Sequence, residues 1–122
     1  MSNKRVRNLI SRKYIKYGFC DYDIETYKVM NCVYFVTDGE FVKIGIAKLF
    51  AKRLSGLQTG SSRELKPLCV CMFDNFIWAQ KYEKLLHDYF SDKHIRGEWF
   101  KIDENDIKCA KENFSLTMHR CI

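Results

Sequence analysis

The chain has little of what builds disordered or membrane-spanning proteins. It contains a single proline and six glycines among 122 residues, which argues against a long disordered segment. No stretch approaches the roughly 20 apolar residues that a membrane-spanning helix needs. No apolar run of signal-peptide length follows the basic N-terminus. We therefore expect no membrane partner and a cytoplasmic location.

The six cysteines lack the spacing of a metal site or a disulfide framework. They lie at positions 20, 32, 69, 71, 109 and 121, and no two form a C-x-x-C pair. The alternating pair Cys69 and Cys71 is typical of a strand. Reduced thiols in a cytosolic protein are therefore favoured over a disulfide scaffold.

The residues that are present suit one folded domain with a polyanionic partner. Hydrophobic residues make up 47% and aromatic residues 15% of the chain, enough for a single core. The 21 basic and 15 acidic residues leave a net charge of +6. This surplus favours nucleic acid over a membrane surface, although many soluble domains carry such a charge for solubility.

Residues 1–30 are predicted to be a basic N-terminal extension, helical over residues 3–17. Apolar residues recur there at helical spacing among basic side chains. The basic residues that would contact nucleic acid are Lys4, Arg5, Arg7, Arg12 and Lys13. A helix packed on the core with a solvated basic face explains the pattern equally well.

A β-hairpin is predicted where Asp38-Gly39, a two-residue turn signal, separates two runs of β-forming residues, 33–37 and 40–44. That turn would place Tyr34 directly opposite Lys43, on the face that does not carry Phe35. A phenol beside an ammonium group resembles a site, but the pairing on its own favours a structural tyrosine–lysine pair on a half-exposed sheet.

Two predicted helices carry further polar candidates. In the helix over 49–57, helical periodicity places Arg53 with the apolar stripe, toward the sheet and away from solvent. An arginine in that position needs an anion, either an internal carboxylate or a bound phosphate. In the helix that Asn75 caps, Glu83 and His87 share one flank and could reach one site, although both could also be ordinary surface residues.

In order along the chain, these residues resemble the GIY-YIG endonuclease superfamily, in its short phage and viral branch, over about residues 31–102. Val33-Tyr34-Phe35 represents the first motif and Lys43-Ile44-Gly45 the second, with lysine where better-known members have tyrosine. Arg53 and Glu83 match the family's arginine and metal-binding glutamate. The segments 83–87 and 96–100 resemble the signature of the short branch. A late asparagine has no clear counterpart, and Glu98 or its loop fills that space.

The resemblance implies an α+β domain over residues 31–122, with a small three-stranded antiparallel sheet flanked by helices and a last helix after Asp103. It implies a hydrolase that cuts nucleic-acid phosphodiester bonds, DNA more than RNA, with one Mg²⁺ or Mn²⁺ ion on Glu83 and no nucleotide cofactor. The catalytic candidates are Tyr34, Lys43, Arg53, Glu83 and His87.

The implied roles divide by chemistry. Tyr34 would orient or deprotonate water, helped by Lys43 lowering its pKa, with His87 as the alternative base. Arg53 would bind the scissile phosphate. Lys93 and Arg96, in the charged loop 92–96, would contact phosphates outside the centre. A non-catalytic nucleic-acid-binding module and a viral adaptor for a host protein remain the alternatives, and the oligomeric state is not indicated.

Overall fold

The computed structural model describes residues 29–116 and 119–120. The elements are β1 (Met30–Thr37), β2 (Val42–Leu49), α2 (Phe50–Thr59), β3 (Lys66–Met72), α3 (Phe76–Tyr89), the 3₁₀ turn η2 (Ser91–Lys93), β4 (His94–Arg96), β5 (Trp99–Phe100), α4 (Glu104–Phe114) and β6 (His119–Arg120). The predicted N-terminal helix lies outside the described residues, with its basic side chains. None of the described helices has the length and apolar character to cross a membrane.

One antiparallel sheet forms the centre of this part of the chain, in the strand order β4-β5-β2-β1-β3-β6. The α+β class is confirmed. The prediction of a three-stranded sheet was wrong, because β4 and β5 extend it beyond β2 and β6 adds to β3. The sequence predicts an edge strand or extended segment over 98–102, where β5 lies; β4 and β6 have only three and two residues, too few for an alternating pattern to be recognised.

The helices begin where the sequence predicts. The Asn75 side chain accepts a hydrogen bond from the backbone amide of Trp78, 3.1 Å away, and so caps α3. Asp103 and Asp106 form a reciprocal capping box at the start of α4. Because the caps set the helix boundaries, Glu83 and His87 lie on α3 as predicted.

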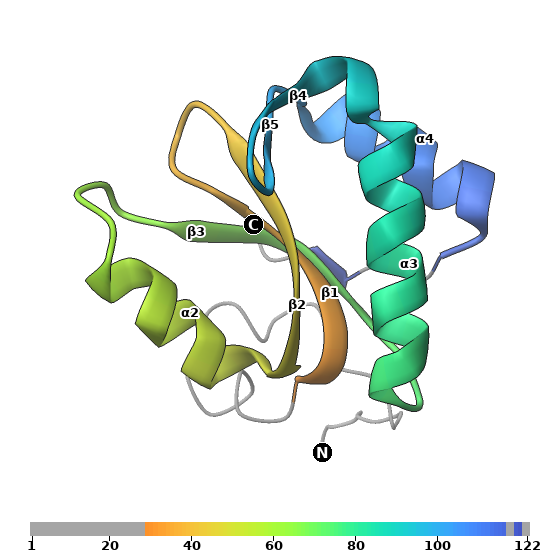
Figure 1. Ribbon diagram of the computed structural model, residues 1–122, viewed down its shortest axis with the longest axis horizontal. Coiled ribbons are helices and arrows are strands. Elements are labelled where there is room, and N and C mark those ends of the chain that lie inside the picture. Colours follow the sequence, from red (N-terminus) through yellow and green to blue (C-terminus); the bar gives the residue numbers. More distant parts are fainter. Residues whose placement is uncertain (1–28, 117–118, 121–122) are drawn as a thin grey trace.

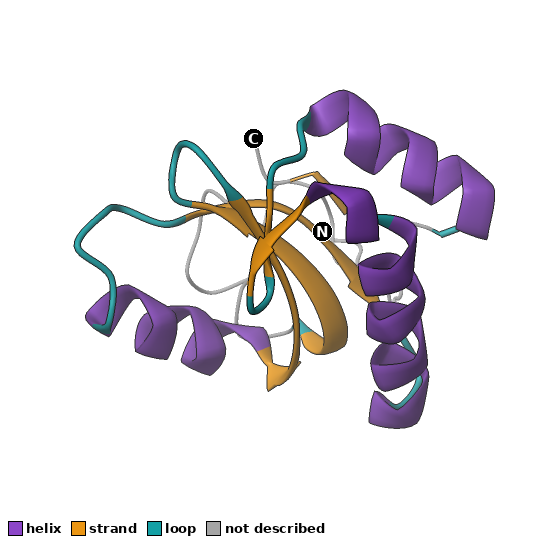
Figure 2. Ribbon diagram, turned by 45° about the horizontal axis from the view of Figure 1, so that its top comes forward, coloured by secondary structure: helices purple, strands orange, loops and turns teal. Residues whose placement is uncertain are grey.

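The helices cover both faces of the sheet (Figures 1 and 2). On one face, Val33, Phe35 and Ile44 pack with Leu86 of α3 and Ile107 of α4. On the other face, Tyr34, Val36 and Val70 pack with Phe50 of α2. The sequence predicted this division of β1 side chains between two faces, which follows from the two-residue period of a strand.

The register of the β1–β2 hairpin differs from the prediction by two residues. Thr37 pairs with Val42, so Tyr34 lies opposite Gly45 rather than Lys43. The turn is longer than predicted because the Asp38 carboxylate accepts hydrogen bonds from two backbone amides, those of Glu40 (2.9 Å) and Phe41 (2.8 Å). An even shift leaves every side chain on its predicted face, but it changes which residues oppose one another.

Candidate active site at the outer edge of β2

The outer edge of β2 is where side chains from the two faces of the sheet can meet. β5 pairs only with Val42 and Lys43, and the Ile44 amide donates to the carbonyl oxygen of Glu98 at 2.9 Å. Among the described residues, no strand pairs with this side of β2 beyond that point. The edge from Gly45 onward is therefore available to side chains instead of a neighbouring strand.

Tyr34 extends from β1 across Gly45 toward this edge. Its side chain is fully buried, and its ring lies 5.6 Å from that of Phe50. The absence of a side chain at Gly45 makes this path possible, since a Cβ there would lie only 2.5 Å from Cζ of Tyr34. Within the described part of the chain, the buried Tyr34 hydroxyl has no hydrogen-bond partner.

The electrostatic environment of Tyr34 differs from the one predicted. Burial raises the pKa of the phenol, and the negative charges of Glu98 and Glu83 raise it further. The opposing positive charge comes from Arg53. Lys43 was predicted to be its cross-strand neighbour and to lower this pKa. That placement was wrong, because Lys43 pairs with Val36 across the hairpin.

Lys43 is engaged with the turn between β4 and β5. Its Nζ lies 3.0 Å from Oε1 of Glu98 and 5.6 Å from the centre of the Trp99 ring. Gly97 precedes Glu98 with a φ of +58°, a left-handed conformation that favours glycine. The turn therefore holds Glu98 beside the edge of β2.

Glu83 reaches the same place from α3. One of its carboxylate oxygens, Oε2, is buried and has no hydrogen-bond partner among the described residues. Burial raises the pKa of Glu83, and the charge and a hydrogen bond of Glu98 raise it further, while His87 and Lys43 oppose them. Glu83 and Glu98 therefore lie close enough for the charge of one to act on the other.

His87 is fixed by the backbone of β2. Its Nε2 donates a hydrogen bond to the carbonyl oxygen of Ile44 at 2.9 Å; a carbonyl only accepts, so this nitrogen carries the hydrogen. The ring packs edge-on against Phe100, with centroids 4.9 Å apart. Oε2 of Glu83 lies 3.9 Å from Nε2, too far for a hydrogen bond. In this arrangement Nε2 cannot act as the general base. His87 instead bonds the backbone of β2 and lowers the pKa of Glu83.

Arg53 is an exposed residue of α2, which corrects the prediction that it points away from solvent. It forms no ion pair with any carboxylate in the described part of the chain, yet its charge acts on Tyr34. Arg53 also lines a groove of about 690 Å³ beside α2. We call this the α2 groove, and its lining residues are Ala47, Lys48, Leu49, Lys52, Arg53, Gly56, Leu57 and Phe76.

The α2 groove adds cations that the sequence analysis did not single out. Lys48 and Lys52 line it together with Arg53, and Nζ of Lys48 lies 5.3 Å from the centre of the Phe76 ring. The three occur within six consecutive residues, at the end of β2 and the start of α2. That clustering was a usable signal. Lys93 and Arg96, predicted phosphate contacts, are exposed on η2 and β4.

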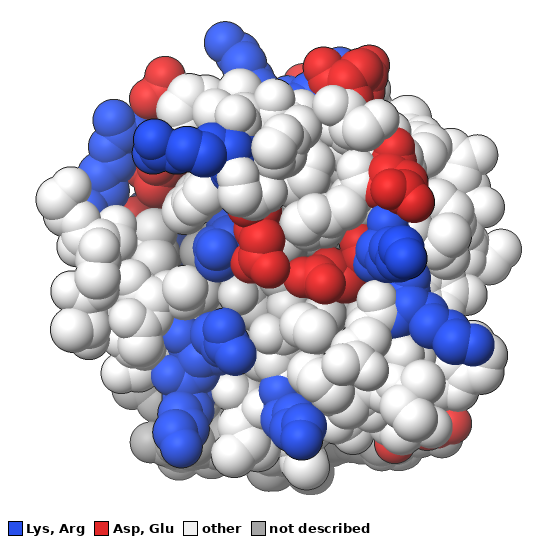
Figure 3. Space-filling model, viewed as in Figure 1, with Lys and Arg blue, Asp and Glu red and all other residues white. Residues whose placement is uncertain are grey.

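The surface around the site has a polarised charge pattern. Figure 3 shows acidic side chains near the centre of this face, with basic side chains on either side of them, over α2 and over α3. Because basic groups flank the acidic centre, a polyanion could cross it while a cation occupied its middle.

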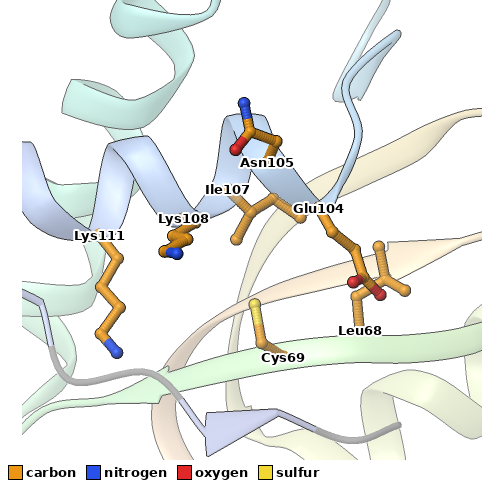
Figure 4. A pocket seen from close by; sticks show the side chains of 7 residues that line it. All are labelled: Leu68, Cys69, Glu104, Asn105, Ile107, Lys108 and Lys111. Carbon is orange, nitrogen blue, oxygen red and sulfur yellow. The ribbon is translucent and has the colours of Figure 1, made fainter.

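A second cavity, of about 460 Å³, lies between β3 and α4 (Figure 4). Glu104 lies at one end of it and Lys111 at the other, with Cys69 of β3 between them. β3 is on the opposite side of β1 from β2. None of the sequence-predicted site residues within 29–116 lines this cavity, so it is separate from the edge of β2.

The donor set at the edge of β2 suits a hard divalent cation. The described residues contain no group of three or more His, Cys, Asp and Glu side chains that could hold a metal. Mg²⁺, however, keeps several waters and takes only one or two carboxylates from the protein. The buried, unpartnered Oε2 of Glu83, with a second carboxylate beside it, fits that requirement.

Comparison with known proteins identifies a family for most of the chain. Residues 31–115 match the T5orf172 domain, which is associated with nuclease-like proteins. No curated protein and no solved structure gives a significant match. The matched segment contains β1 through α4 and therefore every residue of the β2-edge site. The chain belongs to the T5orf172 domain family.

Proposed function

We propose that the protein is a divalent-metal-dependent endonuclease that hydrolyses nucleic-acid phosphodiester bonds by GIY-YIG-type chemistry, with DNA as the preferred substrate. The observation that carries this proposal is the pair of buried oxygens without partners, Oη of Tyr34 and Oε2 of Glu83. A buried polar atom without a hydrogen bond costs about 1–3 kcal/mol. Two such atoms at one edge of the sheet are expected where a ligand completes the site.

The residues divide the work of hydrolysis between them. Arg53 binds the scissile phosphate, because it is exposed and near enough to Tyr34 for its positive charge to lower the pKa of the phenol. Tyr34 orients the attacking water. Glu83 holds the metal ion, which, when bound, supplies positive charge to the phosphate and to the developing transition state.

The charges around Tyr34 explain why it would accept a proton only with the metal ion bound. Glu98 and Glu83 raise its pKa, so at neutral pH the phenol keeps its proton while both carboxylates are unneutralised. Burial raises the pKa most; a cation held by the two carboxylates would oppose their effect and act in the same direction as Arg53, which lowers the pKa. In this proposal, proton transfer at Tyr34 is coupled to metal binding.

The direct test is cleavage of supercoiled plasmid, single-stranded DNA and RNA with Mg²⁺, Mn²⁺ or EDTA. We expect cleavage of DNA that EDTA abolishes. Cleavage that persists in EDTA would contradict the metal requirement. Binding without cleavage of any substrate would favour the non-catalytic module. The absence of both binding and cleavage would favour the adaptor for a host protein.

Tyr34→Phe should separate the chemistry of the site from its structure. Removal of one hydroxyl leaves the buried ring in place, and the loss of a general base typically lowers turnover by about 10²-fold or more. Because the hydroxyl has no partner, the free energy of unfolding should not fall. The measurements are the single-turnover cleavage rate and thermal unfolding. A variant that cleaves at the wild-type rate would exclude Tyr34 from the reaction.

Substitution of the groove lysines should weaken nucleic-acid binding without changing the chemistry. For Lys48→Ala/Lys52→Ala, the slope of log affinity against log salt concentration should become shallower by roughly 0.7–0.9 for each lost phosphate contact. The matched control is Lys108→Ala/Lys111→Ala on α4, beside the second cavity. Equal slopes for the two double variants would show that the α2 groove does not bind the phosphate backbone.

A further inference from the structure

Glu98 lies in the segment 96–100 that resembles the signature of the short branch, but the resemblance assigns the metal ion to Glu83 alone. Its backbone carbonyl accepts from the Ile44 amide at 2.9 Å, so its position depends directly on β2. Gly97, with a φ of +58°, sets the turn that brings it there. The backbone around Glu98 is therefore held in place by two independent features.

The Glu98 side chain faces another carboxylate although solvent is available to it. The side chain is 41% exposed, yet Glu98 and Glu83 are both held beside Ile44: the Glu98 carbonyl accepts from the Ile44 amide, and His87, 3.9 Å from Oε2 of Glu83, bonds the Ile44 carbonyl. Lys43 supplies one positive charge, 3.0 Å from Oε1 of Glu98. One lysine can balance only one of the two carboxylates when both are ionised.

The surroundings of the pair point to a bound cation. Oε2 of Glu83 is buried without a partner, and the fully buried Tyr34 extends an unpartnered hydroxyl toward the same edge. Ligand oxygens of two carboxylates, with water and a phosphate oxygen, make the octahedral shell that Mg²⁺ and Mn²⁺ prefer.

We propose that Glu98 is a second carboxylate ligand of the divalent metal ion, together with Glu83, and that Lys43 holds Glu98 in the metal-free protein. This inference rests on the metal dependence proposed above. It assigns a residue outside the helix of Glu83 to the metal, so the β4–β5 turn becomes part of the metal site.

The test is calorimetric titration of MnCl₂ into the full-length protein without nucleic acid. Glu98→Gln removes the charge and keeps the shape, and Glu83→Gln does the same on α3. Glu112→Gln, on the exposed surface of α4, is the matched control. We expect the control to bind like the wild type and Glu98→Gln to bind at least about 10-fold more weakly, as loss of a metal-site partner does.

A further variant separates charge from position. Glu98→Asp keeps the carboxylate on a shorter side chain, and its affinity should fall between those of the wild type and Glu98→Gln. If Glu98→Gln binds Mn²⁺ like the wild type while Glu83→Gln does not, Glu98 is not a ligand and the proposed function stands. If the wild type shows no saturable Mn²⁺ binding, the metal dependence and the role of Glu98 both fail.

Discussion

Glu83→Gln should abolish metal-dependent cleavage and at the same time stabilise the protein at neutral pH. The carboxylate is the proposed metal ligand from α3, so its loss removes the charge stabilisation that typically accounts for about 10²–10³-fold in rate. Its Oε2 is buried without a partner. A residue needed only for structure would show the opposite behaviour, since its replacement would lower stability.

The pH dependence of this stability has a definite sign. The pKa of Glu83 is raised above its ordinary value of 4.5 by burial and by Glu98. The folded state therefore binds this proton more tightly than the unfolded chain does. The resulting contribution to the free energy of unfolding is fully present below pH 4.5. It is lost as the pH rises through the raised pKa, so the charged form destabilises the fold at neutral pH.

Thermal unfolding with EDTA present, at about pH 4 and about pH 7.5, checks this prediction. The variant should unfold at a higher temperature than the wild type at the higher pH, and the difference should shrink at the lower pH. A wild type that is the more stable of the two at neutral pH would show that Glu83 has a stabilising partner. Glu112→Gln is again the control for a surface charge.

Gly45→Ala should destabilise the fold and disturb the site, although it adds only a methyl group. The new Cβ would lie 2.5 Å from Cζ of Tyr34 and still nearer to its hydroxyl. The Tyr34 ring is buried against Phe50 and has little room to move. Overpacking of this kind costs about 1–3 kcal/mol. In a domain of this size, each kcal/mol of lost stability lowers Tm by about 4–8 °C.

The matched control is the same substitution in an open position. Gly56 lies within α2, and a Cβ there would meet nothing within 4 Å. Because alanine is the better helix former, Gly56→Ala should raise stability by up to about 1 kcal/mol. The double variant Gly45→Ala/Tyr34→Phe removes the hydroxyl that the new Cβ meets and should recover part of the loss. If the double variant is as unstable as Gly45→Ala, the clash with the Tyr34 hydroxyl is not the cause of the lost stability.

Side-chain periodicity and capping residues predicted most of the fold, because both depend on neighbours in sequence. Asn75 and Asp103 cap the helices as expected, and the two faces of β1 carry the predicted sets. The hairpin register was not predictable from Asp38-Gly39 alone. The Asp38 carboxylate accepts hydrogen bonds from two backbone amides and so stabilises a longer turn.

Long-range geometry also explains what the sequence could not predict about the site. Periodicity correctly placed Tyr34 and Lys43 on one face, but only the register shows that Gly45 lies opposite Tyr34. The association of Lys43 with Glu98 depends on β5 pairing with β2; the sequence indicates an edge strand or extended segment over 98–102 but does not say which strand it joins. Arg53 was expected to be hidden from solvent, yet it is exposed at the edge of the α2 groove, where a phosphate could reach it.

Because β5 is short, part of the edge of β2 stays uncovered among the described residues, and a longer β5 in a related sequence would cover it. β5 pairs with only two residues of β2, and Gly45 comes two residues after the last of them. Two further residues in β5, each matched by one in β4, would extend the strand by about 7 Å, at about 3.4 Å per residue. That extension would place a strand beside Gly45, where the Tyr34 side chain lies over β2. An insertion of four residues in the hairpin could therefore cover the edge of β2, so the length of this hairpin determines whether that edge stays open.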